Sequence, residues 1–533
     1  MKLKKLILPL LAIGSGILMA LAFPPFNHSM VAFISLIPLL FAVRKTSKKQ
    51  TAGLAILMGW TFFLVSLFWL HVLAHRVEGF GMQASVWLGY IFLSLLCALY
   101  FVPPILIFSM AVQRCDPYEW FHNLRIMFIT TACWVAMEYL RATLFTGFSW
   151  NQLGISQYQD LVLIQTASLG GVYAVSFIIV WLNVGLYATL VQHVKTMKIR
   201  KYRVHVELLA GLLPIALTAS FGLRSLFNPP RLDPSIQVAL VQPNIPQMEK
   251  WDKGEAEKIR KNLLRQTQMV QRIPGLDLIV WPETAVPDFL CFSYPDYQLV
   301  QKVVRQGTPL LLGTMDAKNR TEKIFYNSSL LIHADGQIAN RYQKQHLVPF
   351  GEYVPFPSIM KKFTPVEVDI QAGTNSTLFT LPNKAPFSAL ICFEDTVAPL
   401  SVKAVRNGAR WLVNQSNDGW FEGSIEAEQH LAHAVFRAIE NRVPMARCCN
   451  YGVTCSIDFY GRITSKLKPE VGGFSACPIR PSSAKNELTF YTRKGDLFAK
   501  AMLVFSGIVF VLFFLTRKKI KSTADDLGLD GKK

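Results

Sequence analysis

The chain contains a series of apolar runs that carry almost no charge, and these runs constrain its fold more than any other feature. A helix crosses the hydrocarbon of a bilayer with about 20 mostly apolar residues, and roughly 17–25 are tolerated. We therefore expect eight membrane helices, with a re-entrant segment as the alternative for the run at 29–43. The runs lie at about 6–22, 29–43, 51–73, 84–112, 126–142, 162–190, 208–223 and 501–516.

The positive charge of the chain is distributed in step with these runs. A net charge of +20 would suggest nucleic-acid binding in a soluble protein. Here Lys and Arg gather in alternate loops, as the positive-inside rule describes, so we expect no nucleic-acid partner. Arg76 is the main exception among the outer loops. The pattern predicts that both termini are cytoplasmic and that residues 225–498 lie outside the cytoplasm.

The first apolar run has a second interpretation. The basic start "MKLKK", an apolar stretch and the small residues at 20–22 resemble a secretory signal with its cleavage site. The stretch is long for such a signal and further spanning runs follow it, so we favour an uncleaved first helix. Cleavage would leave the outer position of residues 225–498 unchanged.

Residues 225–498 differ from the rest of the chain, because short β-rich runs alternate there with helical patterns. That alternation is typical of a layered α/β domain. We expect strands that include 236–242, 276–281 and 387–392, and a helix at about 249–272. The predicted division is 1–224 for seven helices, 225–498 for the α/β domain, 499–517 for the last helix and 518–533 for a cytoplasmic tail.

The chain has nine cysteines, and their spacing indicates neither a disulfide framework nor a metal site. No Cys-x-x-Cys pair or His/Cys cluster is present, so we expect no bound metal. Cys392 nevertheless stands out, because it ends a buried apolar run and two carboxylates follow closely in "ICFED" at 391–395.

Three polar residues follow three predicted strands. Glu283 follows one strand in "WPET", Lys344 follows a hairpin, and Cys392 closes another strand. Ligands gather at the ends of strands in open α/β sheets, so these side chains can converge although they are far apart in sequence. A thiolate could attack a carbonyl, with Glu283 as general base and Lys344 as the cation that stabilises the oxyanion. Taken singly, each residue also has a purely structural explanation.

The motifs around these residues resemble those of the nitrilase, or carbon–nitrogen hydrolase, superfamily. Together with the membrane helices, they make the chain similar to the apolipoprotein N-acyltransferase family over roughly residues 1–516. The motifs are "WPET" at 281–284, "YQKQHLVPFGE" at 342–352, "ICFED" at 391–395, "TGFSWNQLG" at 146–154, "NIPQ" at 244–247, "NDGWF" at 417–421 and "TRKGD" at 492–496.

The resemblance implies an α-β-β-α sandwich with Glu283, Lys344 and Cys392 as a catalytic triad. It further implies supporting active-site residues and residues close to lipid or substrate. The supporting residues are Glu352, Glu394 and Asn327, and the proximal residues are Trp251, Tyr353 and Phe421. Phe393 departs from the family pattern, where Tyr commonly follows the nucleophile, so a phenolic hydrogen bond is missing or comes from elsewhere.

The resemblance also implies a reaction and a location. Cys392 would take an acyl chain from a phospholipid, expected to be phosphatidylethanolamine, and hold it as a thioester. The α-amine of a diacylglyceryl-cysteine at the amino terminus of an apolipoprotein would then accept the chain. The implied protein is a monomer in the bacterial inner membrane, with its catalytic domain on the periplasmic side, and it needs no metal or nucleotide cofactor.

Two other functions stay open from the residues alone. A membrane-tethered amidase of the nitrilase type would use the same site on a small amide. A transporter or receptor with an outer binding domain would not depend on Cys392. Some polar residues elsewhere have structural interpretations. Glu138 and Arg141 share one helix face, where a structural ion pair and contact with lipid headgroups are both open. His430 and His433 are expected to be hydrogen-bonded or solvated rather than catalytic.

Overall fold

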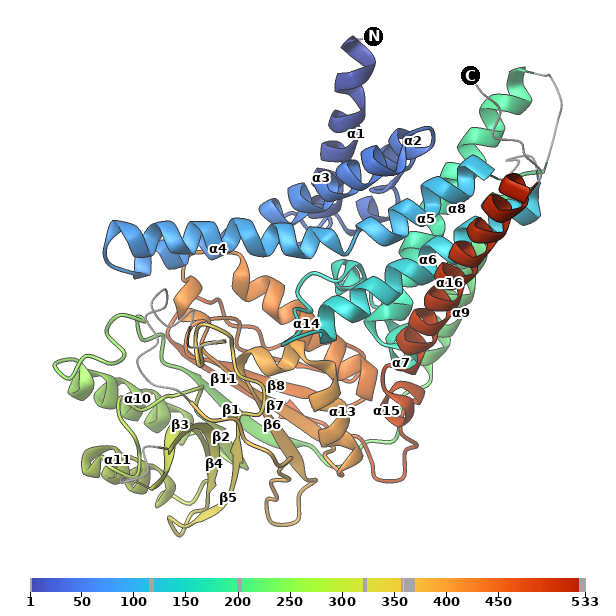
Figure 1. The fold of residues 1–533 in the computed structure, drawn as a ribbon. Coiled ribbons are helices and arrows are strands. Elements are labelled where there is room, and N and C mark those ends of the chain that lie inside the picture. The colour runs from blue at the N-terminus through green and yellow to red at the C-terminus, as the bar shows by residue number, and fades with distance from the viewer. Residues whose placement is uncertain are drawn as a thin grey trace.

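The structure is a computed structural model that describes residues 2–114, 119–198, 204–319, 324–355, 358 and 370–526. Helices from both ends of the chain form one region, which we call the helical region, and a layered α/β domain packs against it (Figure 1). The α/β domain is inserted between helix α9 (Val206–Phe227) and helix α16 (Leu497–Asp526). The described residues thus form a helical region and a layered α/β domain.

The helical region contains long helices joined by short breaks. Its elements are α1 (Lys2–Leu21), η1 (Ser29–Phe33), α2 (Ile37–Val43), α3 (Lys48–Ser66), η2 (Phe68–Arg76), α4 (Phe80–Leu99), α5 (Val102–Arg114), α6 (Trp120–Thr143), η3 (Leu153–Gln157), η4 (Leu163–Thr166), α7 (Ala167–Gly170), α8 (Val172–Lys198), α9 and α16.

Fewer than eight of these helices meet the length and hydropathy needed to cross a membrane. Among the described residues, three do so: Phe80–Arg114, Val172–Met197 and Val206–Phe227. The bent pair α3 and η2, at 52°, adds a fourth if it is one span. Shorter apolar helices cover Leu6–Leu21, Ser29–Val43 and Leu497–Leu512. The structure thus has apolar helices at most of the predicted runs, but α6 at the run 126–142 is not among them, and eight clear spans are not reproduced.

The predicted helix at 162–190 begins later than expected. The chain forms only short helical turns before Gly171, and α8 begins at Val172. Gly171 has φ +66°, and a Cβ at this position would lie 2.6 Å from the Tyr491 ring. The apolar pattern cannot reveal this break, because close packing against a distant residue causes it.

One sheet of the α/β domain has six strands in the order β11-β1-β2-β3-β4-β5. Strands β1, β2 and β3 are parallel, with Leu240 paired to Val280 and Val280 to Leu311. Parallel strands are covered on both faces, which explains their continuous apolar runs. The strands are β1 (Ile236–Gln242), β2 (Leu278–Val280), β3 (Leu310–Asn319), β4 (Ile324–Ile332), β5 (Ile338–Gln343) and β11 (Gly473–Ile479).

The second sheet has five strands in the order β10-β9-β8-β7-β6. Its strands β6, β7 and β8 are parallel, with Ile391 paired to Gln415 and Gln415 to Cys448. The strands are β6 (Phe387–Ile391), β7 (Trp411–Ser416), β8 (Met445–Cys449), β9 (Cys455–Ile457) and β10 (Ile463–Thr464).

The two sheets pack face to face between two helical layers, as the α-β-β-α expectation requires. Val238 and Val280 from one sheet share an interior core with Ala389 and Val413 from the other. Helices α10 (Ala256–Val270) and α11 (Tyr294–Val304) cover the outer face of the six-stranded sheet. Helices α13 (Ala398–Arg406) and α14 (Glu426–Asn441) cover the other sheet, and their core continues into the helical region.

The predicted helix at 249–272 is wrong at its start, since α10 begins at Ala256. The preceding residues form turns, and the side chain of Lys250 is only 1% exposed. An exposed amphipathic helix would have placed this lysine in water. Tertiary contacts of the preceding loop override the helical pattern here.

Gln429 on α14 joins the α/β domain to the helical region. Its Oε1 accepts from Trp69 Nε1 at 3.1 Å and from Trp150 Nε1 at 2.8 Å. Its Nε2 donates to the carbonyl oxygens of Pro24 at 3.1 Å and Ser66 at 3.0 Å. Because a buried amide is costly to leave unpaired, these bonds fix the orientation of α14 against the helices.

Candidate active site

The three residues singled out from the sequence lie at the ends of strands in two facing sheets. Glu283 follows β2, Lys344 directly follows β5, and Cys392 directly follows β6. Gly313 on β3 lets the main chain at Pro282 and Glu283 pass close to β3. A Cβ at position 313 would lie 2.8 Å from the Cα of Glu283 and closer still to the carbonyl oxygen of Pro282. The strand ends therefore place all three side chains in one region between the sheets.

Lys344 binds two carboxylates in a buried position. Its Nζ lies 2.8 Å from Glu352 Oε1 and 3.6 Å from Glu283 Oε1. Asn327 Nδ2 on β4 donates to the same two oxygens, at 3.2 Å and 2.7 Å respectively. Burial alone would lower the pKa of Lys344, but Glu352, Glu283 and Cys392 outweigh it and raise the pKa. Lys344 is therefore a permanent cation in this site.

Glu352 is held by the chain that follows Lys344. Its Oε2 accepts from the Val348 N–H at 2.8 Å, which leaves Oε1 to face Lys344 and Asn327. The loop returns toward the sheet where the Ile370 N–H donates to the carbonyl oxygen of Glu352. The expected second carboxylate of the site thus lies against the lysine.

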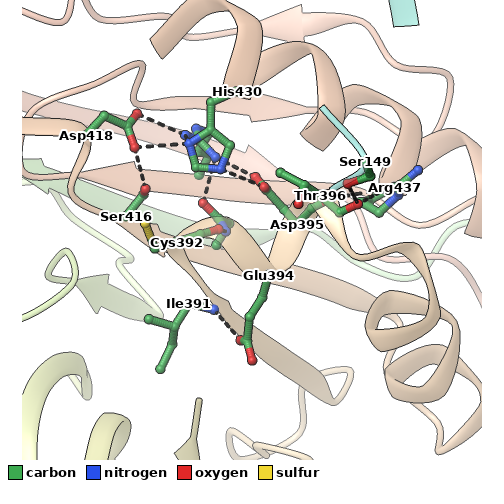
Figure 2. Close-up of polar contacts among 12 residues, drawn as sticks. Ser149, Ile391, Cys392, Glu394, Asp395, Thr396, Ser416, Asp418, His430 and Arg437 are labelled. Atoms are coloured by element: carbon green, nitrogen blue, oxygen red, sulfur yellow. Dashed lines mark hydrogen bonds and ion pairs between the residues drawn. The ribbon is translucent and has the colours of Figure 1, made fainter. Parts of the chain in front are cut away.

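Cys392 has an unusual backbone conformation for a residue with a side chain. Its φ is +52°, in the left-handed region, and it begins a 3-10 turn that runs to Thr396. Left-handed conformations cost a non-glycine residue roughly 1–2 kcal/mol, and such strain is frequent at functional sites. The turn directs the side chain of Cys392 toward Ser416 (Figure 2).

The Cys392 thiol does not ionise readily in this environment. Burial raises its pKa well above the ordinary value, and Glu283 and Asp418 add to that effect. Lys344 and a hydrogen bond with Ser416 oppose it. A thiolate therefore forms only if a neighbouring group takes the proton, and the Glu283 carboxylate is suited to this role.

Glu394 connects the nucleophile segment to the lysine segment. Its oxygens accept from the main-chain N–H of Ile391 at 2.8 Å, Gln345 at 2.6 Å and His346 at 3.0 Å. The hydroxyl of Tyr342 on β5 donates to the same carboxylate at 2.8 Å. Burial raises the pKa of Glu394 to about 7 against these hydrogen bonds. The four bonds hold the residues beside Lys344 and Cys392 at a fixed separation.

Phe393 does not require the hydroxyl of the Tyr that is common in the family. Its ring stacks on Trp150 at 6.2 Å with an interplanar angle of 3°, and on His346 at 5.9 Å. The hydroxyl of Tyr342 supplies a phenolic hydrogen bond to Glu394 from a different strand. The departure from the family pattern therefore leaves Glu394 hydrogen-bonded.

The three residues expected near lipid occupy different surroundings. Trp251 is 46% exposed, and Tyr353 and Phe421 are half-buried. The Phe421 ring packs edge-on against Trp69 of η2 at 4.7 Å, so it belongs to the contact with the helical region. Apolar and aromatic residues follow Glu352 at 353–357, and of these Phe356 and Pro357 lie outside the described residues.

A cavity of about 660 Å³ opens next to the site, at the junction of the α/β domain with the helical region. Phe393 and His346 line it, and each lies within two residues of Cys392 or Lys344. Phe145, Tyr353 and Val397 supply apolar or aromatic walls. The side chains of Cys392, Lys344 and Glu283 lie beside this cavity without lining it.

A buried ionic network packs behind the nucleophile, and Figure 2 shows His430 at its centre. His430 Nε2 lies 2.7 Å from Asp395 Oδ1 and its Nδ1 lies 3.0 Å from Asp418 Oδ1. The Ser416 hydroxyl donates to Asp418 Oδ1 at 2.7 Å, and the Arg447 guanidinium binds both aspartates. The expectation that His430 is hydrogen-bonded is confirmed.

His433 contradicts the same expectation. It is buried, and among the described residues neither ring nitrogen has a hydrogen-bond partner. Its ring packs on Trp150 at 5.2 Å. Burial and the nearby Arg437 lower its pKa well below the ordinary value. It is a neutral packing residue, which helical spacing alone could not distinguish from a solvated one.

The network around His430 predicts a pH-dependent stability. Burial and Arg447 would lower the pKa of His430, but Asp395 and Asp418 raise it to about 10. Because its pKa is higher in the folded state, protonated His430 contributes its full stabilisation of the fold below about pH 6.5. That contribution is lost as the pH rises through 10. Thermal unfolding at pH 6 and pH 10 measures it. Each kcal/mol lost lowers Tm by roughly 2–4 °C.

The comparison variant for that measurement is His430→Gln, with His333→Gln on the β4–β5 turn as the matched control. We expect a smaller Tm difference between the two pH values for His430→Gln than for the wild type. His333→Gln should keep the wild-type difference. An equal Tm difference in His430→Gln and the wild type would contradict a charged His430.

Glu138 and Arg141 on α6 do not form the ion pair that their spacing suggested. Glu138 Oε1 accepts from the Leu153 N–H at 2.8 Å and from Trp134 Nε1 at 3.0 Å. Arg141 Nη1 donates to the carbonyl oxygens of Phe148, at 2.9 Å, and Trp150, at 2.7 Å. Both side chains hold the loop at 146–154, and this loop carries Trp150 to the nucleophile segment.

Family models match two parts of the chain. The "Apolipoprotein N-acyltransferase N-terminal domain" model matches residues 15–185, and the "Carbon-nitrogen hydrolase" model matches residues 237–482. The apolipoprotein N-acyltransferase of Geobacter metallireducens is 32% identical over 517 residues, covering 96% of both chains. The chain belongs to the apolipoprotein N-acyltransferase family. The resemblance inferred from the sequence motifs is confirmed.

A second full-length relative agrees with this membership. The apolipoprotein N-acyltransferase of Pasteurella multocida is 31% identical, covering 87% of this chain and 88% of that protein. Nit3 of Saccharomyces cerevisiae, described as a nitrilase-superfamily member, is 18% identical with a TM-score of 0.36, covering 47% of this chain and 92% of that one. The nitrilase-like fold assignment rests on the family model and on the four-layer topology.

Two features of this family member were missed from the sequence. Lys250 lies buried beside Glu283, although the sequence pattern placed it on an exposed helix. Arg447 and Asp418 belong to the buried network behind the nucleophile, and no local pattern indicates their pairing. The family resemblance singled out Trp251, which directly follows Lys250 in the sequence, but gave no indication of a role for Lys250 itself.

Proposed function

We propose that this acyltransferase moves an acyl chain from a phospholipid to the amino-terminal diacylglyceryl-cysteine of an apolipoprotein through a thioester on Cys392. The observation that carries the proposal is the convergence of Cys392 with Lys344 and its two carboxylates at the strand ends. The names of its full-length relatives support the apolipoprotein as acceptor. Phosphatidylethanolamine is the proposed donor.

In the first half-reaction Glu283 takes the proton of the Cys392 thiol. The thiolate attacks the ester carbonyl of the phospholipid, and Lys344 stabilises the oxyanion that forms. When the tetrahedral intermediate collapses, the ester C–O bond breaks and Glu283 returns its proton to the leaving alkoxide. A lysophospholipid departs, and Cys392 holds the acyl chain as a thioester.

In the second half-reaction the α-amine of the acceptor attacks the thioester. Lys344 again faces the oxyanion, and Glu283 removes a proton from the attacking nitrogen. The C–S bond breaks, an amide forms, and the sulfur regains its proton from Glu283. Glu352 keeps Lys344 in position through both steps and Asn327 keeps Glu283 in position, since each contacts its partner and a hydrogen bond joins Asn327 to Glu352.

The proposed arrangement in the membrane follows the charge pattern. Eight spans, with residues 1–224 and 499–517 in the inner membrane, would leave residues 225–498 in the periplasm and both termini in the cytoplasm. A monomer is sufficient, because every proposed site residue comes from one chain. Apolar side chains at Phe145, Tyr353 and Val397 make the cavity of about 660 Å³ the proposed place for an acyl chain.

The test uses purified protein in detergent with a phospholipid that carries a labelled acyl chain. Without acceptor, we expect label bound to the protein and released by hydroxylamine, as for a thioester. Adding a diacylglyceryl-cysteine peptide should move the label into a hydroxylamine-stable amide on the peptide. Release of the label to water at the same rate with and without peptide would support the amidase alternative and overturn the proposal.

A further inference from the structure

Lys250 extends into the site from a loop that other parts of the fold hold in place. The Asn244 N–H donates to the carbonyl oxygen of Asn450, and the Ile245 N–H donates to Asn450 Oδ1 at 3.0 Å. Asn417 Nδ2 donates to Gln247 Oε1 at 2.7 Å. The segment between β1 and α10 is therefore fixed against the loops that follow β7 and β8.

The side chain of Lys250 is buried with little to compensate its charge. It is 1% exposed, and its Nζ donates to the carbonyl oxygen of Glu283 at 3.1 Å. Among the residues that the structure describes, it forms no ion pair with a carboxylate. A buried ammonium with one neutral acceptor is expensive, so a lysine in this position calls for a compensating role.

The charge balance of the site supplies such a role. Glu283 and Glu352 are two anions, and both already contact Lys344. When Cys392 ionises, three negative charges lie near the single cation Lys344. The positive charge of Lys250 acts on both Glu283 and Cys392, so it reduces this imbalance. A second ammonium is therefore most valuable at the moment when the thiolate forms.

We propose that Lys250 is a second active-site cation, which orients Glu283 through its carbonyl and stabilises the Cys392 thiolate. It is a positioning residue, because it acts on the nucleophile and the base rather than on the acyl group. The inference deepens the proposed function, which needs this thiolate. It is tested through thiol reactivity, so it can fail while acyl transfer is observed.

The role of Lys250 should depend on pH. Burial lowers its pKa to about 8, while Glu283 and Cys392 oppose that effect. The other charged groups that face Cys392 are Lys344 after β5 and Asp418 after β7. The ammonium is present below pH 8 and is lost above it, so stabilisation of the thiolate should weaken as the pH rises through 8.

The experiment measures alkylation of Cys392 by iodoacetamide, in which the thiolate displaces iodide, on the full-length protein from pH 6 to pH 10. Mass spectrometry of the Cys392 peptide gives the rate. In the wild type, the increase of the rate with pH should become shallower above pH 8. Lys250→Met should slow alkylation about tenfold or more at pH 7, because one unit in the thiol pKa is tenfold in thiolate.

Two further variants make the result decisive. Lys250→Arg keeps a charge that does not titrate in this range, so its rate should continue to rise steeply above pH 8. Lys258→Met, at an exposed lysine on α10, is the matched control and should follow the wild type. Equal profiles for Lys250→Met and the wild type would overturn the proposal. If Lys250→Met does not fold, a Lys250→Arg profile that still becomes shallower at pH 8 would overturn it.

Discussion

A Cys392→Ala enzyme should form no acyl-enzyme and should lose acyl transfer by on the order of 10⁴-fold or more. The loss is large because the nucleophile divides one difficult transfer into two easier steps, and the buried thiol of Cys448 on β8 is not placed to replace it. Cys448 is buried between the sheets, and its sulfur donates to the carbonyl oxygens of Val241 and Val280 at 3.3 Å. Its environment excludes substrate.

The measurement is the amount of hydroxylamine-sensitive label on the protein after incubation with labelled phospholipid. Cys291→Ala is the matched control, because Cys291 is an exposed cysteine of the same domain. We expect the control to retain wild-type label and Cys392→Ala to retain none. Equal labelling of the wild type and Cys392→Ala would contradict a thioester at this residue, whatever the identity of the acceptor.

A Lys344→Met enzyme should be the second most damaged variant, with thioester formation reduced by about 10³-fold or more. Loss of one oxyanion donor alone costs roughly 10²–10³-fold. Here the lysine also separates Glu283 from Glu352. Without it, the two carboxylates lose the cation that both contact, so Glu283 would also lose part of what holds it in position. The two effects should therefore combine.

The same substitution should destabilise the fold, since removing one partner of a buried ion pair costs about 3–5 kcal/mol. Thioester formation is therefore measured on protein shown to be folded by its thermal unfolding. Lys384→Met is the matched control, because its ion pair with Asp277 at 2.9 Å is partly exposed to solvent and is worth about 0–1 kcal/mol. Full activity of a folded Lys344→Met would remove this lysine from the mechanism.

Both predictions concern residues, Cys392 and Lys344, whose neighbouring main-chain N–H groups donate to the carboxylate of Glu394. Glu394 binds the segment after Lys344 and the segment before Cys392 through the same carboxylate. On the other side of the nucleophile, Asn414 Nδ2 donates to the carbonyl oxygen of Cys392 at 3.1 Å, and Arg447 in turn donates to Asn414. Hydrogen bonds from Glu394 and from Asn414 on β7 thus hold the backbone on both sides of Cys392.

Several elements could be predicted from the sequence because their signal is local. Parallel strands buried on both faces produce short apolar runs, and β1 and β6 agree with the predictions at 236–242 and 387–392 within a residue. Polar residues directly after such runs stand at the strand ends, where binding sites gather. Glu283, Lys344 and Cys392 could be singled out for that reason, and the family motifs added Glu352 and Glu394.

Other elements depend on contacts between distant residues. The helix expected from 249 begins at Ala256, because the loop before it is hydrogen-bonded to the loops after β7 and β8. The break at Gly171 results from packing against Tyr491. Neither contact leaves a periodic signal in the sequence, since the partner lies more than a hundred residues away.

The sequence alone determined the layered α/β fold, the apolar helices and the catalytic chemistry to be expected, because each depends on residue type at short spacing. The tertiary structure decided which groups are charged and which are neutral. Lys344 lies between two carboxylates, His430 between two aspartates, and Lys250 beside a carbonyl oxygen. Burial makes the electrostatics of a side chain depend on its few nearest neighbours, and only the packed chain brings those neighbours together.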